Sequence, residues 1–212
     1  MISKFFSRII NEYKQSSINS LFESLKYEET IKCKNILALY LDGGGNINIR
    51  NIEGIPLINY IIYSHIGNVS PLVQLLINRG ADINIKSDDR LTPLMIAADQ
   101  DDFSSVKLLI EAGADLNIKD KFNFTALAYA IGNLNYEIIE LLLINKANIN
   151  IELKDCRYNY IDIYDDTTLK EFADIVYNNI PEKSDKRADF INDKYEKMHK
   201  SYLSITKLLE NY

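Results

Sequence analysis

The sequence predicts an all-α solenoid of stacked helix-turn-helix units, and three observations support this fold class. The stretch GADINIKSDDRLTPLMIAA at residues 80–98 returns thirty-three residues later as GADLNIKDKFNFTALAYA at 113–130. Weaker copies begin at Gly44 and Lys146, so the four starts are spaced by 36, 33 and 33 residues. An apolar segment with helical spacing precedes each start. Such a fixed period is typical of repeat proteins, in which each unit buries its apolar face against the next.

Composition and charge limit the function classes. The 212 residues carry a net charge of −6 with a pI near 5.0, which argues against general affinity for nucleic-acid phosphates or anionic lipid. Cys33 and Cys156 are too few for a disulfide framework and lack metal-site spacing, which favours a reducing compartment. No apolar run approaches the roughly eighteen residues of a membrane span, and the start of the chain lacks the apolar core of a secretory signal. We therefore expect a cytoplasmic protein; the sequence leaves open delivery into another cell.

Residues 1–34 are expected to form an N-terminal helical cap and a degenerate first unit. Helical spacing runs through residues 2–14 and 18–27. A second helix is expected at Thr30 to Leu41. The expected inward-facing residues are Phe5, Ile9, Tyr13, Ile18, Phe22 and Leu25.

The repeats proper are expected at residues 35–151, each with a turn, a short helix and a long helix. Gly80 and Gly113 follow long helices, where the chain turns left-handed at little cost to glycine. Asn84 lies in the following turn, which suits asparagine because its side chain bonds to nearby backbone. Thr92-Pro93-Leu94 then begins the short helix, with threonine as N-cap and proline at the first helical position. The long helices are apolar over most of their circumference, so neighbouring helices should cover them on both sides.

These features together resemble ankyrin repeats, most strongly in the two central units. The resemblance implies a solenoid with β-turn or hairpin tips, which binds other proteins through the tips and the exposed side of the short helices, around a concave groove. The chain departs from the family at Met95 and Ala128, where histidine is usual, so the hydrogen bonds of that histidine are not assumed. Lys146 replaces the fourth helix-ending glycine.

Residues 152–212 are expected to form an irregular loop followed by an elongated C-terminal capping helix pair. The stretch ELKDCRYNYIDIYDD separates the last repeat turn from Thr167-Thr168-Leu169, where the next short helix should start. A final helix is expected at about 188–211, with apolar residues that step by four and three. This helix either caps the stack or forms a seam for a second copy or a partner. The seam residues are Ile191, Tyr195, Met198, Tyr202, Ile205, Leu209 and Tyr212.

The sequence offers little for catalysis or for a bound cofactor. His65 and His199 lie in different units and neither pairs with a nucleophile or a metal motif. The cluster of Asp99, Asp101 and Asp102 is expected to be a solvated helix connection. Gly43-Gly44-Gly45 follows a helix and lacks the lysine and hydroxyl of a phosphate loop. We expect no enzyme, no metal and no cofactor, with an enzyme built on residues 152–212 as an alternative.

The predicted function is non-enzymatic binding of another protein across the concave face. Phe122 and Phe124 stand out among the tip residues because a solvated turn does not need two aromatics, whereas aromatic anchors dominate interfaces. The alternative is that one of them packs inward. Met95 and Ile58 are expected in the core. The candidate partner-binding residues are Arg50, Lys86, Asp88, Asp89, Arg90, Asp99, Lys119, Lys121, Phe122, Phe124, Tyr129 and Asn133.

Two further functions stay open. The chain is either an inhibitor, immunity-like or effector-type protein that blocks a basic partner, or a structural protein that self-associates through its C-terminal helix. We expect a monomer that binds neither nucleic acid nor membrane, with a homodimer through residues 188–212 as the alternative.

Overall fold

The computed structural model describes residues 18–23, 25, 30–64, 68–158, 161–178, 200, 202–207 and 209–210. Three successive units each consist of a seven-residue helix followed by a nine-residue helix, as predicted. The helices are α2 (Thr30–Asp42), α3 (Leu57–Tyr63), α4 (Ser70–Asn78), α5 (Pro93–Asp99), α6 (Phe103–Glu111), α7 (Ala126–Gly132), α8 (Tyr136–Ile144) and α9 (Leu169–Asn178). The strands are β1 (Glu152–Leu153), β2 (Cys156–Tyr158), β3 (Ile161–Ile163) and β4 (Thr167–Thr168).

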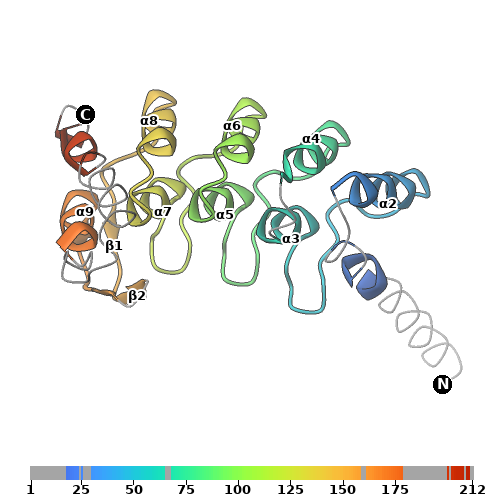
Figure 1. Ribbon diagram of the computed structural model, residues 1–212. Coiled ribbons are helices and arrows are strands. Elements are labelled where there is room, and N and C mark those ends of the chain that lie inside the picture. Colours follow the sequence, from blue (N-terminus) through green and yellow to red (C-terminus); the bar gives the residue numbers. More distant parts are fainter. Residues whose placement is uncertain are drawn as a thin grey trace, which may run out of the picture.

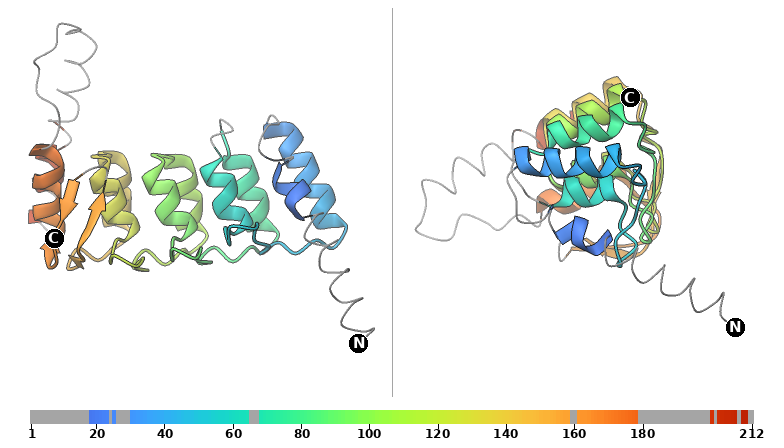
Figure 2. Two further views of the ribbon diagram at one scale, coloured as in Figure 1. Left: turned by 90° about the horizontal axis from the view of Figure 1, so that it is seen from below. Right: turned by 90° about the vertical axis from the view of Figure 1, so that its right-hand side faces the viewer.

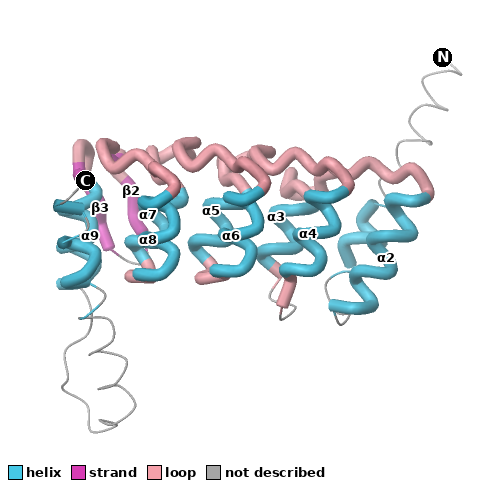
Figure 3. Tube along the Cα trace, turned by 90° about the horizontal axis from the view of Figure 1, so that it is seen from above, coloured by secondary structure: helices cyan, strands magenta, loops and turns pink. Residues whose placement is uncertain are grey.

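The helices form two layers that run along the molecule (Figure 1). The short helices α3, α5 and α7 make one layer, and the longer helices α4, α6 and α8 make the other. Within each layer the middle helix contacts both of its neighbours. The loops that link one unit to the next line up along one edge of the stack (Figures 2 and 3). The predicted all-α solenoid is confirmed.

Polar side chains cap the start of helices in both layers. Thr92 and Thr125 each accept a hydrogen bond on Oγ1 from the amide three positions on, at 3.3 and 3.4 Å, as predicted. Asp102 and Asn135 cap α6 and α8 in the same way. Each such cap stabilises a helix by about 1 kcal/mol, so the polar residues between the two helices of a unit define where the second one begins.

A residue in the left-handed region follows each of the helices α2, α4, α6 and α8, the first being Gly44 with a φ of 83°. Gly80 has a φ of 81° and Gly113 a φ of 87°, which glycine adopts without steric cost. Lys146 holds the same place with a φ of 66°, and its amide donates to the Leu143 carbonyl at 2.9 Å. The turn is therefore kept at the fourth start, at a cost of roughly 1 to 2 kcal/mol for the side chain.

Asparagine side chains tie each turn to the next one. In every case the Oδ1 atom accepts a hydrogen bond from a backbone amide of the following unit. These bonds explain why asparagine recurs with the period of the repeat. The pairs are Asn48 with Asp82, Asn84 with Asp115 and Asn117 with Asn148, at 2.9, 2.9 and 2.8 Å.

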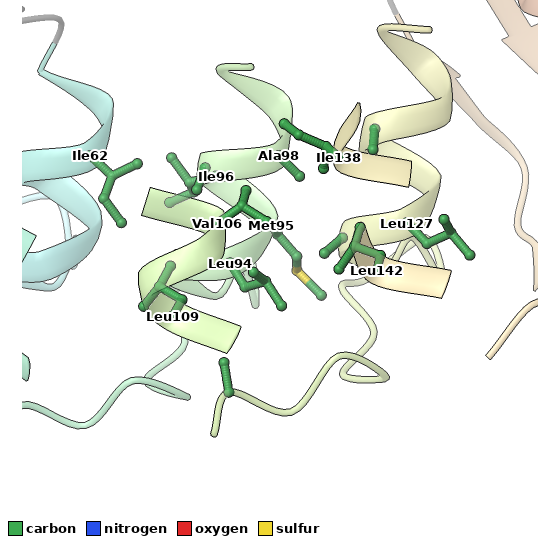
Figure 4. Close-up of a cluster of buried hydrophobic side chains, with 14 of the residues drawn as sticks. Ile62, Leu94, Met95, Ile96, Ala98, Val106, Leu109, Leu127, Ile138 and Leu142 are labelled. Atoms are coloured by element: carbon green, nitrogen blue, oxygen red, sulfur yellow. The ribbon is translucent and has the colours of Figure 1, made fainter. Parts of the chain in front are cut away.

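The core lies between the layers and between successive units (Figure 4). Leu94, Val106 and Leu142 from three different helices are fully or almost fully buried. Met95 and Ile58 are also buried, which confirms their predicted core role. Helices α4 and α6 each contact a long helix on both sides, as predicted, while Leu39 of α2 is 74% exposed and Ile144 of α8 64% exposed. The small alanines at the contacts between units are Ala97, Ala98, Ala126, Ala128 and Ala130.

Residues 18–23 and 25 cover the N-terminal end of the stack. Phe22 and Leu25 are buried, as predicted, and the Phe22 ring meets the Tyr60 ring edge-on at 4.8 Å. The Tyr60 hydroxyl donates to the Phe22 carbonyl at 3.1 Å. The predicted inward residues of 2–14 lie outside the described residues, as do His65 and His199.

The insertion after the last repeat turn was expected to be an irregular loop, and this expectation is wrong. Strand β1 pairs with β4 and β2 pairs with β3, both antiparallel. The amide of Lys154 donates to the Phe122 carbonyl at 3.0 Å, and Asn123 Nδ2 donates to the Glu152 carbonyl at 3.0 Å. These bonds attach the insertion to the third tip. Two-residue and three-residue strands are too short to produce a readable alternation, so the sequence pattern did not reveal them.

Helix α9 begins at Leu169, as predicted. Thr168 and Glu171 form a reciprocal cap, in which Glu171 accepts from the Thr168 amide at 2.9 Å and Thr168 Oγ1 accepts from the Glu171 amide at 3.3 Å. The helical residues 202–207 pack on α9, because the Tyr202 and Tyr177 rings stack at 4.0 Å and Ile205 is fully buried. The described part of the last helix therefore caps the stack, and the rest of the expected seam lies outside the described residues.

Candidate functional site

Three tips project from the stack, and each is held by one polar side chain at the same place in the repeat. Asn51 accepts with Oδ1 from the amides of residues 53 and 55, and Asp120 accepts from those of residues 122 and 124. Ser87 accepts with Oγ from the Leu91 amide at 3.2 Å. Each turn also contains a left-handed residue, and these residues are Gly54, Arg90 and Asn123. The tips thus share one backbone shape, which frees their other side chains to differ.

Neighbouring tips are linked by charged side chains from the predicted set. Arg50 donates to the Lys86 carbonyl at 2.6 Å and lies 3.9 Å from the Asp88 carboxylate. Lys121 Nζ lies 2.6 Å from Asp89 Oδ1, and this carboxylate raises the pKa of Lys121. All four charged side chains are largely exposed, so each ion pair contributes little to stability. They connect the first tip to the second and the second tip to the third.

A groove of about 380 Å³ lies between the first two tips and the short helices. Its lining includes the apolar side chains of Ile55, Leu91, Met95 and Ile96 and the aromatic rings of Tyr63 and Tyr129. Tyr63 at the end of α3 is 58% exposed. Four carboxylates lie around the opening. The lining residues are Glu53, Ile55, Tyr63, Ser87, Asp88, Asp89, Leu91, Met95, Ile96, Asp99 and Tyr129.

A cluster of aromatic rings closes the groove toward the C-terminal end. The Phe124 ring lies 5.4 Å from both the Tyr129 and the Tyr158 rings and 5.3 Å from the Phe172 ring. Phe124 is only 2% exposed, so the prediction that it anchors a partner is wrong. It instead packs the third tip onto α7 and α9. Phe122 is half-buried, with Lys121 Nζ 5.2 Å above its ring, and stays a candidate.

Tyr158 from strand β2 lies over the end of α7. Its hydroxyl is 3.2 Å from Asp99 Oδ1 and 3.3 Å from Asn133 Oδ1, and it shares its one proton between them. A methyl group on Gly132 would come within 2.5 Å of the Tyr158 ring, so glycine is needed for this approach. Asn133 Nδ2 donates to the Asp99 carbonyl at 2.6 Å. The Asn133 side chain therefore bonds to the preceding unit, and the Tyr158 hydroxyl lies against it.

Asp120 is the buried carboxylate of the third tip. Burial raises its pKa above the ordinary value, although the amides of Phe122 and Phe124 and the Tyr129 hydroxyl donate to it and oppose the rise. Burial and the nearby Asp120 carboxylate also raise the pKa of Tyr129, which keeps this hydroxyl protonated. The donation from Tyr129 Oη to Asp120 Oδ2, at 3.0 Å, fixes the ring at the groove edge.

Comparison with known families agrees with this geometry. A family model of ankyrin repeats matches residues 59–155 with three copies. This segment of the chain consists of ankyrin repeats. No curated protein matches it significantly over its sequence. Ankyrin repeats are generally protein-protein interaction modules and are typically non-enzymatic.

At one position where this chain departs from the ankyrin pattern, another side chain supplies a hydrogen-bond acceptor. Met95 stands where the family usually has histidine, and the Thr92 amide donates to its sulfur at 3.4 Å. The thioether is a weak acceptor, so it replaces part of what an imidazole would supply. Ala128 has no such atom, and in that unit the Thr125 side chain alone caps the helix.

The predicted partner-binding residues of the ankyrin array divide into three groups. Asp88, Asp89, Asp99 and Tyr129 line the groove together. Arg50, Lys121, Phe122, Lys86, Arg90 and Lys119 belong to the tips outside it, with Lys86 and Arg90 exposed and Lys119 half-buried. Phe124 and Asn133 are engaged in packing and in contacts between units.

Sequence reasoning missed several groove residues. Glu53 and Tyr63 were not selected because the first unit departs from the thirty-three-residue period and its tip is harder to align. Tyr158 comes from outside the repeats, and only the density of tyrosines in the insertion marked it. Asp120 could have been found, because it occupies the repeat position of Asn51 and Ser87.

The described residues were also compared with the requirements of metal sites, reactive thiols and membrane-spanning helices. Within them, no three His, Cys, Asp or Glu side chains are grouped as metal ligands. Cys33 is buried, and burial raises the pKa of the half-buried Cys156 thiol. In this same part of the chain, no helix combines the length and the apolar character that a membrane crossing requires.

Proposed function

We propose that this ankyrin array binds a partner protein in the groove between the first two tips and helices α3, α5 and α7, and that it does so without catalysis. The observation that carries the proposal is the groove itself, whose apolar floor is reached from solvent past the exposed Tyr63 ring. Aromatic residues at the mouth of a pocket are typical binding hot spots. The residues proposed to contact the partner are Glu53, Tyr63, Asp88, Asp89, Asp99 and Tyr129.

The position of the groove across three repeat units supports this assignment. The groove is formed by residues from three consecutive units, so a docked segment would contact all of them at once. Arg50 links the two tips that frame the groove, and Lys121 links the second tip to the third. We include Phe122 and Lys119 of the third tip as further candidates outside the groove.

Affinity purification from the source cells, with quantitative comparison of variants, tests the proposal. Tyr63→Ser removes the exposed ring at the groove, and Ile144→Ser removes a similarly exposed apolar side chain from α8 in the other layer. Proteins that the wild type captures should be reduced at least severalfold with Tyr63→Ser and unchanged with Ile144→Ser. Equal capture by both variants would show that the groove does not bind these partners.

A further inference from the structure

We infer that the partner inserts a lysine or arginine side chain into the groove, as part of a basic segment. This inference rests on the proposed function and names the chemistry of its ligand. Three properties of the groove support it. The groove is acidic, only part of its negative charge is paired with cations, and its lining includes apolar side chains.

The charged side chains that line the groove are acidic, and within the described part of the chain only two of the four carboxylates are paired with a cation. Asp88 and Asp89 are paired with Arg50 and Lys121. Neither Glu53 nor Asp99 forms a salt bridge with any side chain in the part of the chain that the structure describes. The two carboxylates come from the first tip and from the end of α5, and both line the same groove.

Asp99 is held in place by neutral donors. Its Oδ1 atom is 3.2 Å from the Tyr158 hydroxyl, and its Oδ2 atom accepts from Gln100 Nε2 at 3.1 Å. These bonds fix the carboxylate without neutralising it. Each carboxylate oxygen can accept two hydrogen bonds, so both keep capacity for a further donor. A cationic group from outside would supply that donor and the missing charge.

The floor of the groove suits the aliphatic part of a basic side chain. Lysine and arginine carry a long apolar stem below a charged head, and they bury the stem along apolar surface while the head stays near polar groups. Here the groove lining combines the partly exposed apolar side chains of Ile55 and Leu91 with the four carboxylates. The Tyr63 ring at the mouth adds an aromatic face that attracts cations. A purely apolar segment would leave Glu53 and Asp99 desolvated beside it.

Selection of short random peptides displayed on phage tests this inference on the full chain. Peptides selected on the wild type should be enriched in lysine or arginine at one position. Synthetic copies should bind about tenfold more weakly to Asp99→Asn and to Glu53→Gln, in fluorescence anisotropy titrations at low salt. The matched control is Glu137→Gln, which removes the same charge from the exposed first turn of α8. The advantage of the wild type should shrink as salt rises.

The outcomes separate this inference from the proposed function. Selected peptides without basic enrichment, or basic peptides that bind both groove variants as tightly as the wild type, would overturn the basic ligand. Failure to select any peptide would overturn it as well. In each case loss of partner capture by Tyr63→Ser would still support the groove as the docking site. Since Glu53 is exposed, its substitution is not expected to affect folding and keeps the test valid if Asp99→Asn is unstable.

Discussion

The Tyr158 hydroxyl lies 3.2 Å from the Asp99 carboxylate, although the two residues are 59 positions apart in the chain. This contact joins the insertion after the repeats to the end of helix α5. It holds Asp99, which lines the groove, and places the Tyr158 hydroxyl against the Asn133 side chain. The insertion thus determines where the exposed groove ends.

Gly132→Ala should destabilise the protein through Tyr158. The new methyl group would lie within 2.5 Å of the Tyr158 ring, whereas the backbone of Gly132 is helical and accepts alanine. We expect the free energy of unfolding to fall by about 1 to 2 kcal/mol, because overpacking displaces the ring. In a Tyr158→Ala background the same exchange should be neutral or slightly stabilising. Urea denaturation of the four proteins measures this coupling, and equal effects in both backgrounds would contradict it.

Phe124→Ala and Phe122→Ala should differ strongly in stability. Phe124 is buried among three aromatic rings, so its truncation should lower the free energy of unfolding by about 3 to 5 kcal/mol. Phe122 is half-buried, and we expect a loss of about 1 kcal/mol. Chemical denaturation of both variants checks the order, and a larger loss at Phe122 would show that the third tip is packed differently.

Lys146→Gly should stabilise the protein by about 1 kcal/mol, because lysine is strained at a φ of 66° and glycine is not. The converse exchange, Gly113→Lys, should cost a similar amount, because Gly113 has a left-handed φ of 87°. No further steric cost is expected, since nothing lies within 4 Å of the place that the new Cβ would take. Thermal and denaturant unfolding compare the two. A loss of stability in Lys146→Gly would mean that the lysine side chain contributes more than its backbone strain costs.

Asp120 should make stability depend on pH in a specific direction. Its pKa in the folded protein is raised, so the folded state binds its proton more tightly than the unfolded state does. The contribution of this group is therefore fully present below its ordinary pKa of about 3.8 and is lost as the pH rises through the raised value. The free energy of unfolding of the wild type, relative to Asp120→Asn, should increase from pH 7 to pH 4.

Asparagine suits this comparison because Asn51 accepts the same two backbone hydrogen bonds in the first tip. Titrating groups elsewhere affect both proteins alike, so the difference reports Asp120. A relative stability that is constant over this range, or that decreases toward pH 4, would contradict the raised pKa.

The repeated parts of this fold were predictable from the sequence, and the contacts of the insertion were not. Thr92 and Gly80 have local roles, a cap and a left-handed turn, which repetition makes visible. The inward packing of Phe124 depends on Tyr158 and Phe172, which lie in elements without a repeat partner. Periodicity cannot reveal such contacts. The groove was predicted only in outline, since Tyr63 belongs to the unit whose spacing departs from the others.

Site-specific photo-crosslinking in the source cells tests the central claim most directly. A photoreactive phenylalanine analogue replaces Tyr63 in one variant and Ile144 in a second, so that both positions are exposed and only one lies in the groove. The account predicts discrete crosslinked proteins from position 63 that are absent from position 144. No adduct at position 63, or the same adducts from both positions, would contradict it.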